Sequence, residues 1–400
     1  MTQVLTVSPA TALPSLGRGL TFVMAVACGI AVANIYYNQP MLGIIEQAFP
    51  ASSLVGLIPT ATQLGYAAGL FLLVPLGDLM NRRRLIVAQF LGLGFALAAA
   101  AMAPTAGFLI GASILVGAAS TVAQQIVPLA ASLAAPEKRG HTIGTVMAGL
   151  LCGILFSRTL AGFVATQAGW REMFWLGLPL ALLGAASMAI SLPRQPAHSG
   201  IGYGAALRSL AELWRTEPTL RSATIMQAGL FGAFTAFWTI LALHLQEPAF
   251  ALGADVAGLF GVVGAAGVVA APLAGRLADR RGPQMVIRLG AALTLASWLI
   301  FGLWGTIAGL VVGVILLDFG VQSALVSNQH VIYALHPQAR NRLNTIFMTG
   351  MFLGGSAGSA GATAAWNWGG WTAVSVFGAT LAIGVLALRI GRSSADHLSE

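Results

Sequence analysis

The stretch Ile307–Tyr333 reads IAGLVVGVILLDFGVQSALVSNQHVIY and contains one charged residue, Asp318. A helix that spans a bilayer needs about 20 consecutive, mostly apolar residues, so this run is long enough to cross. The whole chain has a similar character, since 57% of its 400 residues are apolar and only 8% are charged. A soluble domain carries about 25% charged residues. The sequence therefore predicts an all-α membrane protein that is surrounded mostly by lipid.

Similar runs recur along the chain between charged or turn-forming segments. We predict twelve spanning helices, at residues 20–45, 53–77, 85–104, 107–133, 143–166, 173–192, 222–245, 255–277, 285–304, 307–333, 344–365 and 371–390. The longest connection, 193–221, is rich in Pro and Gly and includes a short amphipathic stretch, Ala205–Trp214. We therefore divide the chain into a six-helix bundle at 1–192, a cytoplasmic linker at 193–221 and a second six-helix bundle at 222–400.

The distribution of basic residues predicts the orientation. Eighteen of the 20 Lys and Arg residues fall on the side of the predicted membrane that carries the N-terminus. Arg171 falls on the other side, and Arg158 lies within a span. Cytoplasmic loops of membrane proteins are enriched in Lys and Arg. We therefore expect a bacterial inner-membrane protein with both termini in the cytoplasm, and we attribute the net charge of +8 to topology and not to nucleic-acid binding.

The two predicted bundles are related in sequence by one constant offset. A shift of 201 residues places Asp78 on Asp279, Pro136 on Pro337, Arg139 on Arg340, Met147 on Met348, Gly149 on Gly350, Gly153 on Gly354, Gly169 on Gly370 and Trp170 on Trp371. Parallel repeats of six helices build the central pathway of one large class of transporters. We therefore expect two bundles that are related by a pseudo-twofold axis along the membrane normal.

The loop after the eighth predicted helix reads Gly275-Arg276-Leu277-Ala278-Asp279-Arg280-Arg281-Gly282-Pro283, and the first-half copy keeps an acid and a basic cluster. This pattern resembles the cytoplasmic signature of the major facilitator superfamily, Gly-x-x-x-Asp-Arg-x-Gly followed by basic residues. The resemblance implies gating roles for Asp78, Arg82, Gly275, Asp279, Arg280 and Gly282. In that fold Asp78 would contact the N-terminus of the eleventh helix, and Asp279 that of the fifth, when the cytoplasmic side is closed. The alternative is that these charges only set the topology.

Part of the first helix, Ala33–Leu42, resembles the corresponding segment of bacterial exporters in the drug:proton antiporter branch of this superfamily. Two positions depart from that branch. Ser113 stands where its members carry an Arg in the fourth helix, and Ser157–Gly162 replaces the Gly-Pro-x-x-Gly-Gly motif of the fifth helix. The same replacement introduces the charge of Arg158.

Two charged residues lie well inside the predicted spans. Such a charge costs about 2.5–3.5 kcal/mol on insertion scales and is a mark of function. Asp318 lies near the midplane and, in the superfamily fold, would face the pathway, so we predict that it carries the coupling proton together with Arg158. A permanently hydrogen-bonded structural Asp is the alternative. Arg158 has three possible roles: it binds an anionic group of the substrate, pairs with Asp318 in one conformation, or extends outward to the membrane surface.

Uncharged polar side chains within the spans are candidates for substrate binding, because amides and phenols in hydrocarbon must find partners or line water. The candidates are Asn34, Tyr36, Tyr37, Asn38, Gln63, Gln124, Gln125, Gln227, Trp238, Gln322 and Asn328. Hydrogen bonding between helices is the alternative role for about half of them.

Three functional hypotheses follow. The first is a proton-coupled exporter of small amphipathic compounds. The second is a symporter or facilitator for a small organic anion, with Arg158 as the anion clamp. The third, a receptor or scaffold without transport, would need an additional soluble domain.

No ATP-binding P-loop sequence is present, and Cys28 and Cys152 have no disulfide or metal spacing. We expect a monomer without cofactor, metal or enzymatic activity, whose partners are a small-molecule substrate, protons and membrane lipid.

Overall fold

The computed structural model describes residues 17–193 and 202–396, and its regular elements there are all helical. The first half contains α1 (Arg18–Ala33), α2 (Asn38–Ala48), α3 (Ile58–Leu72), α4 (Arg82–Ala101), α5 (Ala106–Ser120), α6 (Ala123–Leu133), α7 (Arg139–Gln167) and α8 (Trp170–Ser191). The second half contains α9 (Tyr203–Thr216), α10 (Pro218–Leu245), α11 (Ala254–Gly264), α12 (Ala266–Arg281), α13 (Pro283–Leu303), α14 (Ile307–Leu335) and α15 (Arg340–Asp396). Short 3-10 turns η1 (Val55–Leu57), η2 (Val74–Asp78), η3 (Pro136–Lys138) and η4 (Pro337–Ala339) join some of them.

Within the described residues, ten helical segments are long and apolar enough to cross a membrane. Three of the predicted spans are interrupted by short breaks, between α1 and α2, between α5 and α6, and between α11 and α12. The pair α11–α12 adds an eleventh crossing. The last segment, α15, is two helices joined at Gly369 and Gly370, whose backbone is not helical, and this adds the twelfth. The predicted architecture of twelve spanning helices is therefore confirmed.

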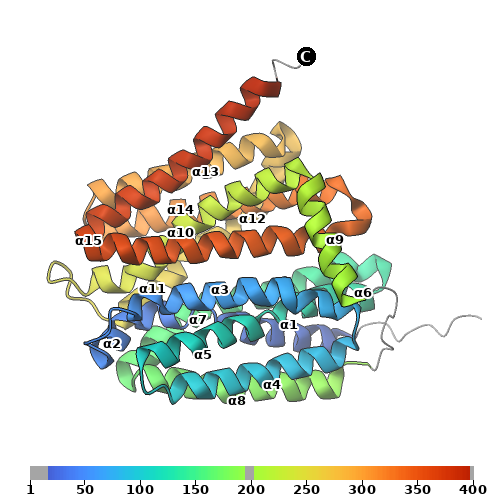
Figure 1. The fold of residues 1–400 in the computed structure, drawn as a ribbon, viewed down its shortest axis with the longest axis horizontal. Helices are drawn as coiled ribbons and strands as arrows, with labels where there is room; N and C mark the ends of the chain where they lie inside the picture. The colour runs from blue at the N-terminus through green and yellow to red at the C-terminus, as the bar shows by residue number, and fades with distance from the viewer. Residues whose placement is uncertain (1–16, 194–201, 397–400) are drawn as a thin grey trace, which may run out of the picture.

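The helices form two layers (Figure 1). Helices α1 to α8 make up the lower layer and α10 to α15 the upper one, with α11 at the boundary between them. Helix α9, which contains the predicted amphipathic stretch, crosses from one layer to the other at one end of the molecule. Residues 194–201 of the predicted linker and both chain termini lie outside the described residues, so the predicted location of the termini is not addressed by the structure.

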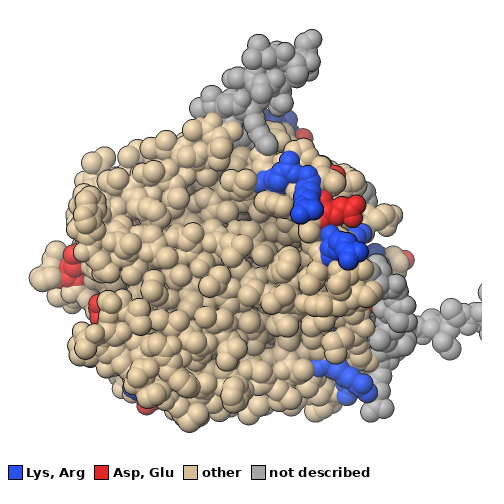
Figure 2. All heavy atoms as spheres, in the orientation of Figure 1, with Lys and Arg blue, Asp and Glu red and all other residues tan. Residues whose placement is uncertain are grey.

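Charge is concentrated at the ends of the molecule. Figure 2 shows Lys and Arg gathered at the end where α9 lies, and a broad uncharged surface across the middle of this face. We call the end that carries Arg82, Arg280 and Arg340 the basic end, and the opposite one the acidic end. Large apolar side chains are exposed on the helices, for example Phe95 of α4 and Phe163 of α7, at 72% and 59%. A surface of this kind is stable only against lipid.

Glycines allow equivalent close helix contacts in the two bundles. Gly153 on α7 packs against Gly29 on α1, and a Cβ atom at Gly153 would meet the backbone of Gly29. Gly354 on α15, its counterpart at the 201-residue offset, packs in the same way against the backbone of Ala228 on α10. Close backbone approach at small residues is a common mode of helix association in lipid, and here both halves use it.

We expect Gly354→Leu to destabilise the second bundle, because the new side chain would have to displace the backbone of α10. Overpacking of this kind costs typically about 1–3 kcal/mol. The measurement is thermal unfolding of the purified protein in detergent. Gly384→Leu is the matched control, since a Cβ at Gly384 on the same element meets nothing within 4 Å. Equal melting temperatures for the two variants would contradict this account.

Candidate functional site

Arg158 lies on α7 at the boundary between the two layers, and its side chain is only 3% exposed. Its guanidinium carbon is 4.5 Å from the ring centre of Tyr36 and 4.0 Å from that of Trp238. Its Nε donates a hydrogen bond of 2.9 Å to Oε1 of Gln39. Tyr36 and Gln39 belong to the first bundle and Trp238 to the second. The arginine is therefore held between aromatic rings from both halves, a favourable cation–π arrangement.

Local sequence explains how these partners reach Arg158. Pro40 lies in the first turn of α2 and has no N–H to continue the hydrogen bonding of α1, so the helix breaks before it. The break places Tyr36 in the connection between α1 and α2, and Gln39 in the first turn of α2. On the opposite side, Gly261 of α11 makes room for the arginine, since a Cβ there would lie 3.0 Å from the Cβ of Arg158.

Asp318 lies on α14 and is 5% exposed. Gly264 and Gly267 pack beside it, and a Cβ at Gly264 would lie 3.2 Å from its Oδ1 and 3.1 Å from Cζ2 of Trp238. Trp238 thus adjoins both Arg158 and Asp318. Asp318 and Arg158 are the only buried residues of the Asp, Glu, Lys and Arg types among the described residues.

The structure contains no ion pair between Arg158 and Asp318, although both are described. Several buried polar atoms around them have no hydrogen-bond partner: Nη2 of Arg158, Nε2 of Gln39, Nε1 of Trp238 and Oδ2 of Asp318. Buried polar groups are nearly always paired, and each exception requires an explanation. Unpaired donors and an unpaired acceptor around one ring are typical of a site that binds a polar ligand.

Of the predicted substrate-binding residues, the structure brings Tyr36 and Trp238 to the two charged groups. The side chain of Gln322 packs beside Gly267, one turn along α14 from Asp318. Gln39 was not among the candidates, although it contacts Arg158 directly. The available signal was its place between Asn38 and Pro40, at a helix break with an amide side chain.

The other candidates lie elsewhere. Most make hydrogen bonds within their own bundle: Asn34 to the Ile30 carbonyl, Asn38 to Thr62, Gln124 to Tyr66, Gln125 to the Leu73 and Val74 carbonyls, and Asn328 to Gln227. Tyr37 is buried, and both amide atoms of Gln63 are buried without a partner. The bond of Asn34 lies within α1, and for the other bonded residues the arrangement matches the alternative role, hydrogen bonding between helices.

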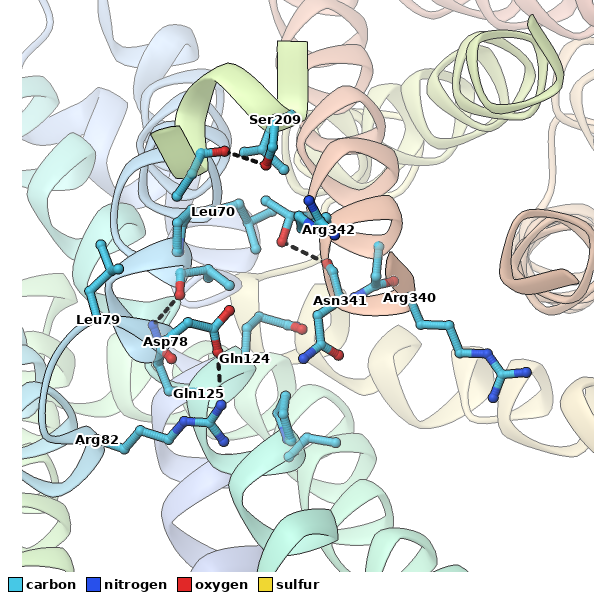
Figure 3. Close-up of a pocket in the computed structure, with 18 of the residues that line it drawn as sticks. Leu70, Asp78, Leu79, Arg82, Gln124, Gln125, Ser209, Arg340, Asn341 and Arg342 are labelled. Atoms are coloured by element: carbon cyan, nitrogen blue, oxygen red, sulfur yellow. Dashed lines mark hydrogen bonds and ion pairs between the residues drawn. The ribbon is translucent and has the colours of Figure 1, made fainter. Parts of the chain in front are cut away.

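A cavity of about 650 Å³ opens at the basic end, and we call it the vestibule (Figure 3). It lies between the two halves, with Leu70, Asp78 and Gln124 on one side and Asn341 and Arg342 of α15 on the other. Helix α9 contributes Ser209 to its wall. The vestibule is large enough for a small organic solute.

The predicted gating residues are apart in this conformation. Asp78 is 60% exposed and pairs with Arg82 at 2.9 Å, across the vestibule from the start of α15 (Figure 3). Asp279 and Arg280 are exposed at the end of α12, and the structure shows no hydrogen bond or ion pair for either. Gly282 ends that helix with φ 82°, a conformation that favours glycine. Gly275 lies one turn before Asp279, in open space.

The acidic end is closed by hydrogen bonds between the halves. Thr60 of α3 donates to Ser359 of α15 at 2.9 Å, and Ser356 donates to the Thr60 carbonyl at 3.2 Å. On the other flank, Thr159 of α7 donates to the Gly258 carbonyl of α11 at 3.1 Å. The molecule is therefore open at the basic end and closed at the acidic end.

Aromatic rings from both bundles meet close to the vestibule. Tyr66 of the first bundle contacts Phe352 of the second, with ring centres 4.3 Å apart, and Phe231 lies 5.1 Å from Phe352. Leu70, one turn from Tyr66 on α3, lines the vestibule. Phe231 also stacks on Phe234, whose ring centre is 6.1 Å from that of Trp238, so a row of rings leads from here to the residue that adjoins Arg158 and Asp318.

Residues Gly354–Gly358 read Gly-Gly-Ser-Ala-Gly, the pattern of a hydrolase nucleophile. That chemistry requires a sharp strand-to-helix turn, whereas this segment lies inside α15. No group of three or more His, Cys, Asp or Glu in the described segments could hold a metal ion. The pattern therefore reflects helix packing.

Comparisons with known proteins agree with this architecture. A sequence profile described as Major Facilitator Superfamily matches residues 21–359. The chain is 42% identical over 370 residues to "Uncharacterized transporter YgaY" of Escherichia coli O157:H7, which covers 92% of this chain and 94% of that protein. It is 22% identical over 404 residues to "Multidrug resistance protein B homolog" of Mycobacterium tuberculosis strain CDC 1551, covering 83% and 74%. Among solved structures, the peptide transporter POT in complex with alafosfalin has a similar fold, with a TM-score of 0.75, 12% identity and coverage of 95% and 97%.

Proposed function

The chain belongs to the Major Facilitator Superfamily and is a multi-pass membrane transporter, and on this basis we propose that it exports small amphipathic solutes from the bacterial cytoplasm in exchange for protons. Transport proceeds by alternating access, in which the two bundles rock about the site that lies between them. The chain acts as a monomer in the inner membrane, with the basic end in the cytoplasm.

The buried carboxyl group of Asp318, whose Oδ2 has no hydrogen-bond partner, carries this proposal. It is the single buried acid among the described residues, it adjoins the aromatic rings at the boundary of the bundles, and no ion pair neutralises it. A buried carboxylate without a partner is costly unless it binds a cation or a proton. Because the two compete for the same oxygen atoms, binding of one releases the other, and this competition couples export to proton entry.

The cavity at the basic end provides the access to the cytoplasm that an exporter needs. With the basic end in the cytoplasm, the vestibule faces the compartment from which an exporter takes its substrate. The arginine-rich loops around it obey the positive-inside rule. The similarity to a protein named as a multidrug resistance homolog supports the same direction and the drug:proton antiporter branch.

The experiment that tests this function uses everted membrane vesicles that contain the protein. Respiration acidifies their interior, and a pH-sensitive dye reports the gradient. We expect at least one lipophilic amine or other amphipathic compound from a panel to dissipate the gradient in these vesicles and not in vesicles without the protein. A panel that leaves the gradient intact, together with solute accumulation by right-side-out vesicles, would refute export by exchange.

A second candidate function is uptake or facilitated transport of a small organic anion. The unpaired Nη2 of Arg158 favours it, since a guanidinium can bind a carboxylate with two parallel hydrogen bonds.

For this candidate we expect Arg158→Lys to weaken anion binding about 10- to 100-fold, because hydrogen bonds to charged groups contribute about 1.5–3 kcal/mol and an ammonium group lacks the planar fork. The measurement is the anion concentration that half-saturates transport into proteoliposomes. Arg171→Lys is the control, since Arg171 also stacks on a tryptophan, Trp170, at 4.2 Å but lies away from the site. Unchanged half-saturation in Arg158→Lys would exclude the anion clamp.

A further inference from the structure

The two buried charges at the centre of the molecule are both held without pairing with each other. Removing an ion from water costs several kcal/mol, and opposite charges that are buried close together normally pair to recover part of this cost. Arg158 and Asp318 both adjoin Trp238, yet no ion pair joins them. Their separation indicates that each charge is kept for a group that is not part of the chain.

The groups left over on the Arg158 side are donors. Nη2 of Arg158 and Nε2 of Gln39 are both buried and unpaired. They belong to neighbouring side chains, because Oε1 of Gln39 accepts the hydrogen bond from Nε of Arg158. Two adjacent donors, one of them on a cation, match the two oxygen atoms of a carboxylate. A cationic group has no acceptor available there.

The group left over on the other side is an acceptor. Oδ2 of Asp318 is buried and unpaired. The neighbouring positions on α11 and α12 are Gly264 and Gly267, which pack closely beside Asp318 and present no polar side chain to its carboxylate. A negative charge in these surroundings matches an ammonium group. The ring of Trp238 between the two sides can support an apolar part of the same molecule.

We propose that the transported solute is a small zwitterion, with a carboxylate that binds Arg158 and Gln39 and an ammonium group that binds Asp318. This proposal rests on the exchange function above and specifies its substrate class. The ammonium group and the coupling proton then compete for Asp318, while the carboxylate remains on Arg158. A compound with only one of the two charges leaves the other site empty and binds more weakly.

The test compares probes that differ only in charge. The purified full-length protein is titrated with phenylalanine, its methyl ester and 3-phenylpropionate, which are a zwitterion, a cation and an anion, and in parallel with leucine, leucine methyl ester and 4-methylpentanoate. Ligands that bind the folded state raise the melting temperature. We expect the zwitterion of at least one series to raise the melting temperature at a concentration about tenfold lower than the cation and the anion of the same series.

Two variants give opposite and specific results. In Arg158→Gln, the methyl ester should raise the melting temperature at the same concentration as the zwitterion or at a lower one. In Asp318→Asn, the anionic probe, 3-phenylpropionate or 4-methylpentanoate, should do so. Arg171→Gln and Asp255→Asn are the controls, because both residues lie at the acidic end, away from Trp238, and they should keep the preference of the parent protein. If the single-charge probes equal the zwitterion in the parent protein, or if neither zwitterion binds, the proposal is wrong.

The failure of this proposal is distinguishable from failure of the exchange function. An amphipathic cation that dissipates the vesicle pH gradient but shows no need for a carboxylate would leave proton exchange in place and overturn only the zwitterion. Zwitterion binding without any effect on the gradient would support the zwitterion as the ligand and overturn proton exchange.

Discussion

Asp318→Asn is expected to abolish proton-driven transport while partly preserving solute exchange. Asparagine has nearly the same shape as aspartate and still offers an oxygen acceptor, but it can neither take up a proton nor carry a charge. Because Asp318 is the single buried acid in the described residues, no other carboxyl group is placed to replace it. Loss of a coupling energy of about 1–3 kcal/mol corresponds to a 5- to 150-fold change in the coupling between proton and solute binding. We expect gradient-driven transport to fall by the upper end of this range.

The measurement has two arms in proteoliposomes that contain one solute identified in the vesicle assay. The first imposes a pH gradient and follows solute movement, and the second follows exchange of labelled for unlabelled solute without a gradient. Asp318→Asn should fail in the first arm and retain activity in the second. Asp255→Asn, which changes an acid in the first turn of α11, should behave like the parent protein in both. Gradient-driven transport at the parent rate in Asp318→Asn would refute the proton-carrier role.

The fold follows largely from the sequence because membrane insertion leaves a simple signal. Each span must be apolar over about 20 residues, and the 201-residue offset makes the repeat visible in the amino-acid order itself. The interruptions within the spans were not predicted, although Pro40 marks the first of them. Mean hydropathy over a whole span does not register a break of one to four residues.

The candidate site was predicted in part. Asp318 and Arg158 were evident because a charge inside a span is rare. Their surroundings were not, because Arg158 contacts Gln39 from a distance of 119 residues along the chain. Amides such as Gln125 and Asn328 look the same in the sequence whether they line a pathway or join two helices, and only the structure distinguishes these uses.

The repeat also shows where the two halves have diverged. At the 201-residue offset, Arg158 corresponds to Ser359 and Gly261 corresponds to Thr60. Thr60 and Ser359 form a hydrogen bond between α3 and α15, whereas Gly261 and Arg158 are in contact between α11 and α7. The interface between α3 and α15 is thus joined through two hydroxyl groups, whereas the corresponding positions between α7 and α11 hold a glycine and the buried arginine of the proposed binding site. The hydroxyl interface is therefore expected to serve as a gate.

Joining the two halves at that interface should stop transport completely. In a Thr60→Cys and Ser359→Cys double variant, made with Cys152→Ser to remove the exposed native thiol, oxidation should form a disulfide. The hydroxyl oxygens are 2.9 Å apart in the structure, so the two side chains that would form the disulfide are adjacent. The cross-linked protein cannot open at the acidic end. Solute counterflow, which requires both states, should fall to background and return when the disulfide is reduced.

The matched control uses the same serine and changes only its partner. Thr239 of α10 donates to Ser359 at 3.0 Å, so a Thr239→Cys and Ser359→Cys pair should cross-link equally well. This bond joins α10 to α15 within the second bundle, and those helices move together if the bundles rock as rigid bodies. Counterflow should therefore survive oxidation in the control. If both cross-links stop transport, the second bundle must deform internally, and if neither does, the acidic end does not open between α3 and α15.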